Sequence, residues 1–182
     1  MNLSEQYKLN KIINTCDKGT RHDYILGYYQ NEFEGKTNIN LLEIGVYKGA
    51  SLLLWSNHFG ESSKIYGIDN KNLVMDEFIN KPNIFFTLSN AYSTDEVEKF
   101  EDEYFDYIID DGPHTLESQL DCVKLWFSKI KKGGKLIIED IQNKQYLEKI
   151  KNYSESYGDV KVFDLTENKG RYDDIIVEIT KK

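Results

Sequence analysis

The sequence predicts an α/β protein with a mostly parallel sheet of about seven strands, helices on both faces and a closing antiparallel hairpin. Three observations support this fold class. Strand and helix segments alternate from about residue 39 onward, which is typical of a parallel sheet wrapped by helices. The strand segments are almost continuously apolar, as parallel strands covered on both faces are. The last two strand segments are separated only by a turn-rich stretch.

The amino-terminal half of the sheet is predicted from three strand segments, at 40–46, 64–69 and 83–88. A helix is expected over 49–59, where large apolar side chains recur every three or four positions until Gly60 ends it. Each of these segments is short, apolar and bounded by turn residues, so each is expected to form one strand of the sheet.

The carboxyl-terminal half begins with a short acidic helix over 96–103 and a fourth strand over 104–109. A helix with one apolar face is expected over 115–130, and two glycines then turn the chain into a fifth strand at 135–140. A further helix is marked by the apolar residues of 146–150.

The end of the chain is expected to form the hairpin, with strands at 160–165 and 174–179. A parallel sheet with one antiparallel edge strand is a common arrangement. The first 38 residues are Tyr-rich and predicted to be helical, as a segment that covers the active site. No linker interrupts the chain, so residues 1–182 are expected to form a single domain.

Composition narrows the class of protein. A hydrophobic share of 40% fits a globular domain, and no apolar run reaches the roughly 18 residues of a membrane span. The amino terminus lacks a secretory signal pattern, so a cytoplasmic location is expected, with Cys16 and Cys122 reduced and packed. The net charge of −8 disfavours nucleic-acid binding, which needs clustered cations.

The turn after the first strand predicts a nucleotide-like cosubstrate. Gly45 and Gly49 let the backbone approach a ligand at a helix amino terminus, but the G-x-G-x-x-G pattern of dinucleotide sites is missing. Glu43 would repel a pyrophosphate and attract an ammonium or sulfonium group, and Asp69 ends the second strand, where an acid can accept from both ribose hydroxyls. These residues favour S-adenosylmethionine over NAD. The expected contacts also include Ser51, Asn70, Asn90 and Asp110.

A second group of polar side chains follows the fourth and fifth strands. Asp111 and His114 come after one apolar strand, and Glu139 and Asp140 come after the other. Ligands bind at the carboxyl ends of the strands in open α/β sheets, so the four side chains should meet at one rim. Such a set could hold a divalent metal ion beside a base.

Several short sequence motifs, taken together, make the chain resemble the class I S-adenosylmethionine-dependent methyltransferases. Within that class the chain resembles the macrolide-sugar O-methyltransferases of the mycinamicin and macrocin type. The words Asp-Asp-Gly-x-His and Ile-Glu-Asp are the specific ones, whereas the glycine loop is shared by many methyltransferases. The matching stretches are 17–24, 41–46, 49–52, 66–69, 108–114 and 133–140.

The resemblance implies a Rossmann-like fold and a magnesium ion held by Asp111, Glu139 and Asp140, with His114 as the base. The expected acceptor is a small molecule or glycan whose vicinal hydroxyls bind the metal. The metal would lower the pKa of a hydroxyl, and catalysis would use Asp111 and His114. The chain departs from the family pattern at Pro113, where serine is usual, and at 89–91, where Asp-Gln is expected near the adenine.

Other interpretations stay open at this stage. A catechol-type methyltransferase would use the same metal on a phenolic diol and should have an apolar, aromatic pocket, whereas a sugar needs a polar, open one. A methyltransferase-like binding protein without turnover and a nicotinamide dehydrogenase are less favoured. His22 could cover the active site or only stabilise the amino-terminal segment, and the tyrosines at 24, 28 and 29 could form an aromatic wall or part of the core. A homo-oligomer is possible.

Overall fold

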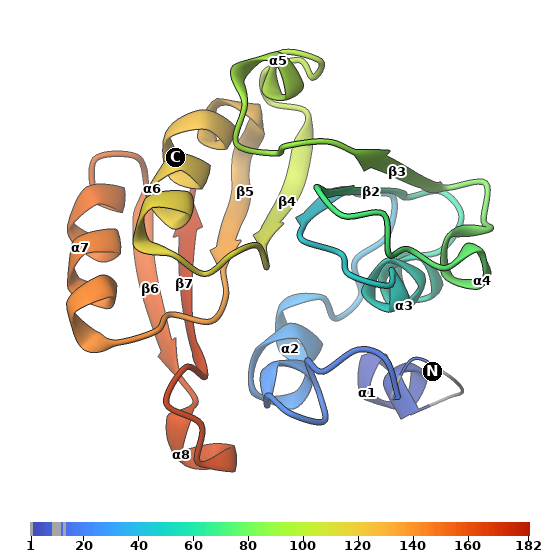
Figure 1. The fold of residues 1–182 in the computed structure, drawn as a ribbon, viewed down its shortest axis with the longest axis horizontal. Coiled ribbons are helices and arrows are strands. Elements are labelled where there is room, and N and C mark those ends of the chain that lie inside the picture. Colours follow the sequence, from blue (N-terminus) through green and yellow to red (C-terminus); the bar gives the residue numbers. More distant parts are fainter. Residues whose placement is uncertain (1, 9–11, 13) are drawn as a thin grey trace.

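A seven-stranded sheet in the order β3-β2-β1-β4-β5-β7-β6 forms the centre of the computed structural model (Figure 1). The structure describes residues 2–8, 12 and 14–182. The strands are β1 (Asn40–Ile44), β2 (Lys64–Asp69), β3 (Ile84–Leu88), β4 (Phe105–Asp110), β5 (Ile130–Ile138), β6 (Asp159–Asp164) and β7 (Ile175–Thr180). The predicted Rossmann-like fold class is confirmed, with four parallel pairings among strands β1 to β5 and a carboxyl-terminal hairpin.

Helices cover both faces of the sheet and enclose two apolar cores. One core joins the amino-terminal helices and α3 to the sheet, and the other joins α6 and α7 to its opposite face. Alternate β1 residues serve the two cores, since Leu41 belongs to the first and Leu42 to the second. The described helices are α1 (Leu3–Lys8), η2 (Ile25–Tyr29), α2 (Gln30–Glu32), α3 (Ala50–Phe59), α4 (Asp76–Ile79), α5 (Thr94–Val97), α6 (Leu116–Trp126), η3 (Phe127–Lys129), α7 (Lys144–Ser154) and α8 (Thr166–Lys169).

The hairpin differs from the prediction in where its antiparallel strand lies. β7 is inserted between β5 and β6 and is antiparallel to both, so it is the second strand from the edge. All but the last residue of β7 are buried, as expected for an inner strand, whereas every residue of β6 is exposed or of intermediate burial.

Three predicted boundaries shift. Gly133 and Gly134 lie inside β5, which begins at Ile130, and the pairing with β4 shifts its register between Phe105 and Tyr107. The acidic helix is reduced to α5, with Ser93 as its cap. The turn of the hairpin contains α8.

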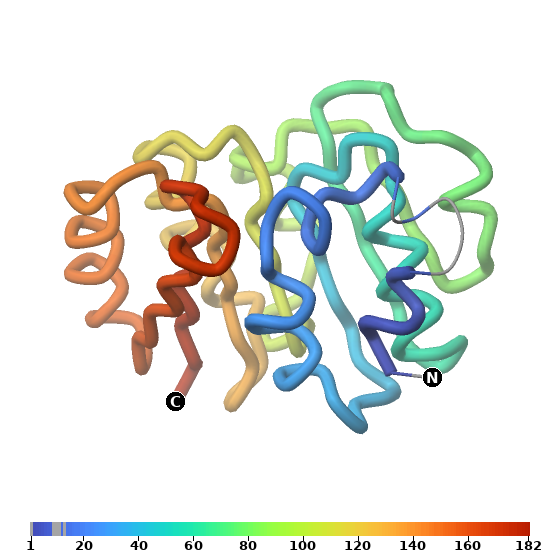
Figure 2. Tube along the Cα trace, turned by 90° about the horizontal axis from the view of Figure 1, so that it is seen from below, coloured from blue at the N-terminus to red at the C-terminus, as the bar shows by residue number. Residues whose placement is uncertain are grey.

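The amino-terminal segment is partly helical and lies between α3 and the hairpin end of the sheet. Its described helices are α1, η2 and α2, while the prediction over 9–11 and 13 falls outside the described residues. Figure 2 shows this segment beside the carboxyl-terminal turn, where the Lys169 ammonium donates to the carbonyls of Gly19 and His22. Within the described part of the chain, no helix has the length and apolarity of a bilayer span.

Candidate active site

A cavity of about 640 Å³ opens at the carboxyl ends of the parallel strands, where the strand order reverses between β1 and β4. The loops after β1, β2, β3 and β4 form most of its wall. The amino-terminal segment closes one side with Asp17, Lys18 and Arg21. The cavity is therefore assembled from the edge at which the sequence predicts ligand binding and from the segment predicted to cover it.

Two glycines shape the loop after β1, and the first of them leaves no room for a side chain. Gly45 has a φ of +81°, and a Cβ atom there would lie 2.0 Å from the carbonyl oxygen of Asp111. Gly49 has a φ of +88° and caps α3. Both conformations favour glycine, so this backbone can form the cavity wall at the amino terminus of a helix. Ser51 lies in the first turn of α3 and also lines the cavity.

Asp69 anchors the same loop through its carboxylate. Its Oδ2 accepts hydrogen bonds from the backbone amides of Val46 and Tyr47 at 3.0 and 2.9 Å, and its Oδ1 accepts from the amide of Lys71 at 2.8 Å. A carboxylate has about four acceptor positions, so roughly one remains for a ligand. Asp69 and Asn70 line the cavity, as does Asn90 on the opposite wall.

The structure does not bring the other two acids of the predicted cosubstrate set to the cavity wall. Glu43 is fully buried and accepts a hydrogen bond from the indole nitrogen of Trp55 at 3.1 Å. Asp110 is also buried and accepts from the hydroxyl of Tyr92 at 2.6 Å. Burial raises the pKa of Asp110 to about 6. Both carboxylates support the cavity from beneath.

Two of the predicted metal ligands converge with the predicted base. The Nε2 atom of His114 lies 3.4 Å from Asp140 Oδ2 and 3.8 Å from Asp111 Oδ1, and all three residues line the cavity. The backbone of His114 and Asp140 has φ values of +57° and +55°, which are uncommon for such residues and often occur at functional sites. Burial lowers the pKa of His114, which keeps its imidazole neutral at pH 7.

Glu139 is separated from this cluster. It is 1% exposed, its Oε1 accepts from the hydroxyl of Tyr29, and its Oε2 accepts from the ammonium of Lys18. Burial raises the pKa of Glu139 to about 7, and Lys18 opposes that shift. Asp111, Asp140 and His114 each offer a donor atom of a type that binds divalent ions, and these atoms lie within 4.8 Å of one another, whereas both oxygens of Glu139 already accept a hydrogen bond.

Lys18 is the central cation of the site and was missed by sequence reasoning. Its ammonium lies 2.6 Å from Asp111 Oδ2 and 3.3 Å from Glu43 Oε1, in addition to the contact with Glu139. Burial alone would lower the pKa of Lys18, but these carboxylates raise it well above its ordinary value, so the group stays charged. The only sequence feature that could have indicated this role is the position of Lys18 within the motif at 17–24.

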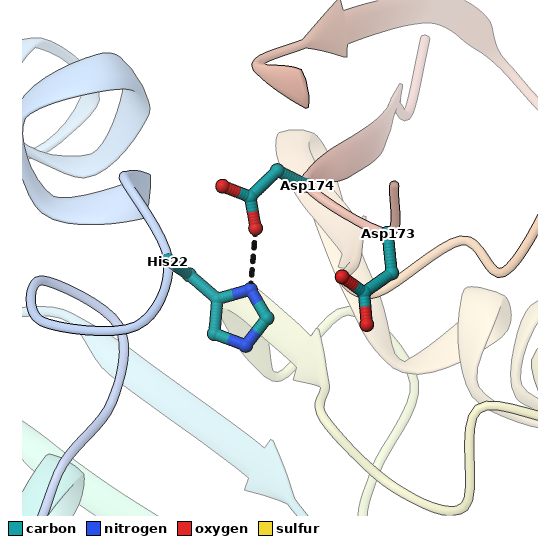
Figure 3. Close-up of side chains that lie close together, drawn as sticks. All are labelled: His22, Asp173 and Asp174. Carbon is teal, nitrogen blue, oxygen red and sulfur yellow. Dashed lines mark hydrogen bonds and ion pairs between the residues drawn. The ribbon is translucent and has the colours of Figure 1, made fainter. Parts of the chain in front are cut away.

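His22 is not a lining residue of the cavity, and it lies against Asp174, just before β7 (Figure 3). Its Nδ1 is 2.5 Å from Asp174 Oδ1 and 3.4 Å from Asp140 Oδ1. Asp173 approaches the same imidazole, but Arg171 donates to its Oδ2 at 2.8 Å and supplies a counter-charge. His22 thus connects the amino-terminal segment to the start of β7.

The tyrosines of the amino-terminal segment are core residues with a polar end. Tyr24, Tyr28 and Tyr29 are at most 3% exposed, and none of them lines the cavity. Their hydroxyls donate to Asp140, Glu178 and Glu139 respectively. They do not form an aromatic wall for a substrate, and the interpretation of these residues as core is the better one.

The comparisons with known proteins concern the family and the fold. A family model described as "Methyltransferase domain" matches residues 42–141. Among curated proteins, none has a sequence that matches the chain significantly.

Solved structures share the fold. MycE methyltransferase from the mycinamycin biosynthetic pathway, in complex with Mg, SAH and mycinamycin VI, is 25% identical with a TM-score of 0.63, over 77% of this chain and 37% of MycE. Crystal form 1 of MycE, in complex with Mg and SAH, gives a TM-score of 0.71 at 20% identity, over 100% of this chain and 55% of that one. Fibrillarin from Aeropyrum pernix, with bound S-adenosyl-L-methionine, gives 0.64 at 19% identity, over 80% of this chain and 67% of that one. The chain thus spans less than two thirds of the MycE chains that it matches.

Proposed function

The chain belongs to the methyltransferase domain family, and from this membership we propose that it transfers the methyl group of S-adenosylmethionine to a sugar or glycan hydroxyl. The observation that carries the proposal is the convergence of Asp111, His114 and Asp140 on the cavity that the Gly45 loop also lines. A cosubstrate at the loop and an acceptor at the acidic cluster would then share one cavity. The bound SAH and mycinamycin VI of MycE support this pairing of sites.

The cosubstrate end uses rigid backbone and one fixed carboxylate. Gly45 lets the loop approach the ligand, and Asp69, held by three backbone amides, would accept from a ribose hydroxyl. Ser51, Asn70 and Asn90 offer further polar contacts along the wall. Glu43 would act on the sulfonium only through its charge, because its side chain lies beneath the wall and is paired with Lys18.

The acceptor end would activate a poor nucleophile. A divalent ion held by Asp111 and Asp140 would lower the pKa of the acceptor hydroxyl. His114, neutral at pH 7, takes the hydroxyl proton on Nε2, the oxygen forms a bond to the methyl carbon, and the bond from that carbon to sulfur breaks. S-adenosylhomocysteine and the methyl ether are the products. Holding the two reactants in line supplies most of the remaining rate.

The lining of the cavity favours a sugar over a phenolic diol. Charged or polar side chains surround the acceptor end, namely Asp17, Lys18, Arg21, Asp111, His114 and Asp140. Tyr47 and Tyr92 are the aromatic residues of the lining. Such side chains offer hydrogen bonds to the hydroxyls of a polyol, while apolar residues such as Ile44, Val46 and Leu73 line other parts of the cavity.

A transfer assay tests the proposal. Labelled S-adenosylmethionine is supplied with sugars, sugar nucleotides, catechols and an RNA oligonucleotide, with Mg²⁺ and with chelator. We expect methyl transfer to a sugar-bearing acceptor, and we expect the chelator to abolish this transfer. Transfer to the catechols alone would show that the acceptor is a phenolic diol and not a sugar. Transfer to RNA would contradict the expectation from the net charge of −8. Binding of NAD in place of S-adenosylmethionine would overturn the proposal.

A further inference from the structure

The ammonium of Lys18 occupies the point where carboxylates from three strand ends converge. Glu43 lies in β1, Asp111 follows β4 and Glu139 follows β5. All three have an oxygen within 3.3 Å of Lys18 Nζ, and the side chain of Lys18 is 2% exposed. A single buried cation therefore already neutralises part of the acidic rim.

We propose that Lys18 removes Glu139 from the divalent-ion site, so that in this chain the ion is held by Asp111 and Asp140 beside His114. This inference rests on the proposed function and defines its cation site more narrowly. It departs from the three-acid set that the sequence resemblance implies. Glu139 becomes a positioning residue, which holds Lys18 against the site instead of contacting the ion.

The allocation of carboxylate oxygens supports this proposal. Asp111 Oδ2 accepts a hydrogen bond from Lys18, and its Oδ1 lies on the side of His114. Asp140 Oδ1 accepts a hydrogen bond from the hydroxyl of Tyr24, and its Oδ2 lies on the side of His114. Each carboxylate thus keeps one oxygen facing the shared space. Both oxygens of Glu139 already accept a hydrogen bond from a buried donor, Lys18 or Tyr29, and Glu139 does not line the cavity.

Electrostatics oppose an ion on the Glu139 side. A divalent ion bound to Glu139 Oε2 would have to replace Lys18 or lie next to its ammonium. Displacing Lys18 from Glu139 would break a buried ion pair, and keeping it there would place two cations in contact. The far oxygens of Asp111 and Asp140 avoid both costs, because they point toward the cavity that His114 lines.

Binding of Mn²⁺ tests the proposal without any activity measurement. Mn²⁺ is titrated into wild type, Asp140→Asn, Glu139→Gln and the double variant Lys18→Met/Glu139→Gln, with calorimetry and electron paramagnetic resonance. The double variant replaces a buried ion pair by a neutral pair and leaves the net charge unchanged. Thermal unfolding of every variant reports whether the fold is retained.

We expect Asp140→Asn to weaken Mn²⁺ binding by more than about 100-fold, beyond the range of groups that do not touch the ion. Glu139→Gln should weaken it by about tenfold or less, because Lys18 is then less neutralised. The double variant should return to within about threefold of wild type, since the excess charge is removed.

A loss in Glu139→Gln as large as that in Asp140→Asn would overturn the inference, and this comparison holds even if the double variant does not fold. A folded double variant that stays as weak as Asp140→Asn would also overturn it. Wild type that transfers methyl groups but binds no Mn²⁺ would remove the ion site and leave the proposed transfer standing. The two proposals can therefore fail separately.

Discussion

The two ends of the cavity are held together in different ways. At the cosubstrate end, Asp69 is fixed by backbone amides of Val46, Tyr47 and Lys71, which belong to the loops that join β1 to α3 and β2 to α4. At the acidic end, the fixing contacts cross the chain. Lys18 lies 93 residues from Asp111 and 121 from Glu139 in the sequence.

The contacts that fix Asp69 involve only the first two strands and their loops, whereas the contacts of the acidic end require the amino-terminal segment to be docked. Without Lys18 and the tyrosine hydroxyls, buried carboxylates would face one another without compensation. The segment thus supplies the partners of the chemical groups in addition to covering them.

The largest expected effect is at the loop of the cosubstrate end. Gly45→Ala places a methyl group 2.0 Å from the carbonyl oxygen of Asp111 at a φ of +81°. We expect the free energy of unfolding to fall by more than about 3 kcal/mol, measured by urea denaturation. Gly35→Ala is the matched control, because its φ of +70° is similar and nothing lies within 4 Å. It should cost about 1 kcal/mol. Equal losses would show that backbone conformation, and not the contact with Asp111, sets the requirement.

At the acidic end, His114→Gln separates chemistry from assembly. We expect the rate of methyl transfer to fall by at least about 100-fold, because the base is removed. Binding of S-adenosylmethionine should be unchanged, and Mn²⁺ binding should stay within about threefold if His114 acts as a base and not as a ligand. His58→Gln is the control, since this histidine lies in α3 and contacts the carbonyl of Phe33. A variant that keeps its transfer rate would contradict the assignment of the base.

The sequence predicts the two ends with unequal success for the same physical reason. The strand segments, the positive-φ glycines and Asp69 are local features, so periodicity and turn chemistry are enough to find them. The roles of Lys18 and Tyr29 depend on which strand ends they reach, and sequence spacing alone does not give that contact. Nor does it separate Glu139 from Asp140, two adjacent acids of which one points into the interior and one toward the cavity.

The position of β7 has a similar cause. Two strands joined by a turn predict a hairpin, but the pattern does not say which of the two strands lies inside the sheet. The simpler expectation is that the antiparallel strand lies at the edge. The insertion of β7 beside β5 places Asp174, just before β7, next to His22 and Asp140. A contact between residue 22 and residue 174 follows from this topology and from no local pattern.

A smaller effect is expected from Asp69→Asn. The amide side chain has one acceptor oxygen and cannot satisfy the backbone amides on both sides of the carboxylate, so the loop should loosen. We expect S-adenosylmethionine to bind about tenfold more weakly in a calorimetric titration, with Mn²⁺ binding unchanged. Asp95→Asn, on the exposed surface of α5, serves as the control. Loss of Mn²⁺ binding in Asp69→Asn would show that the two ends of the cavity are coupled.

The smallest effect concerns the docking of the amino-terminal segment and its dependence on pH. Burial next to Glu178 raises the pKa of Tyr28 well above its ordinary value, so the folded chain keeps a proton that the unfolded chain releases above about pH 10. The stability that Tyr28 contributes is therefore present below pH 10 and lost as the pH rises beyond it.

Tyr28→Phe should lower the free energy of unfolding by about 1 kcal/mol at pH 7, since a hydrogen bond to Glu178 is lost. In urea denaturation at pH 10.5, the difference from wild type should shrink or reverse. Tyr172→Phe, whose side chain is 66% exposed, should show neither change. If the unfolding free energy of Tyr28→Phe stays below that of wild type by the same amount from pH 7 to 10.5, the phenol of Tyr28 ionises in the folded protein as it does in the unfolded chain. The amino-terminal segment would then be docked less tightly than the buried contacts of Lys18 indicate.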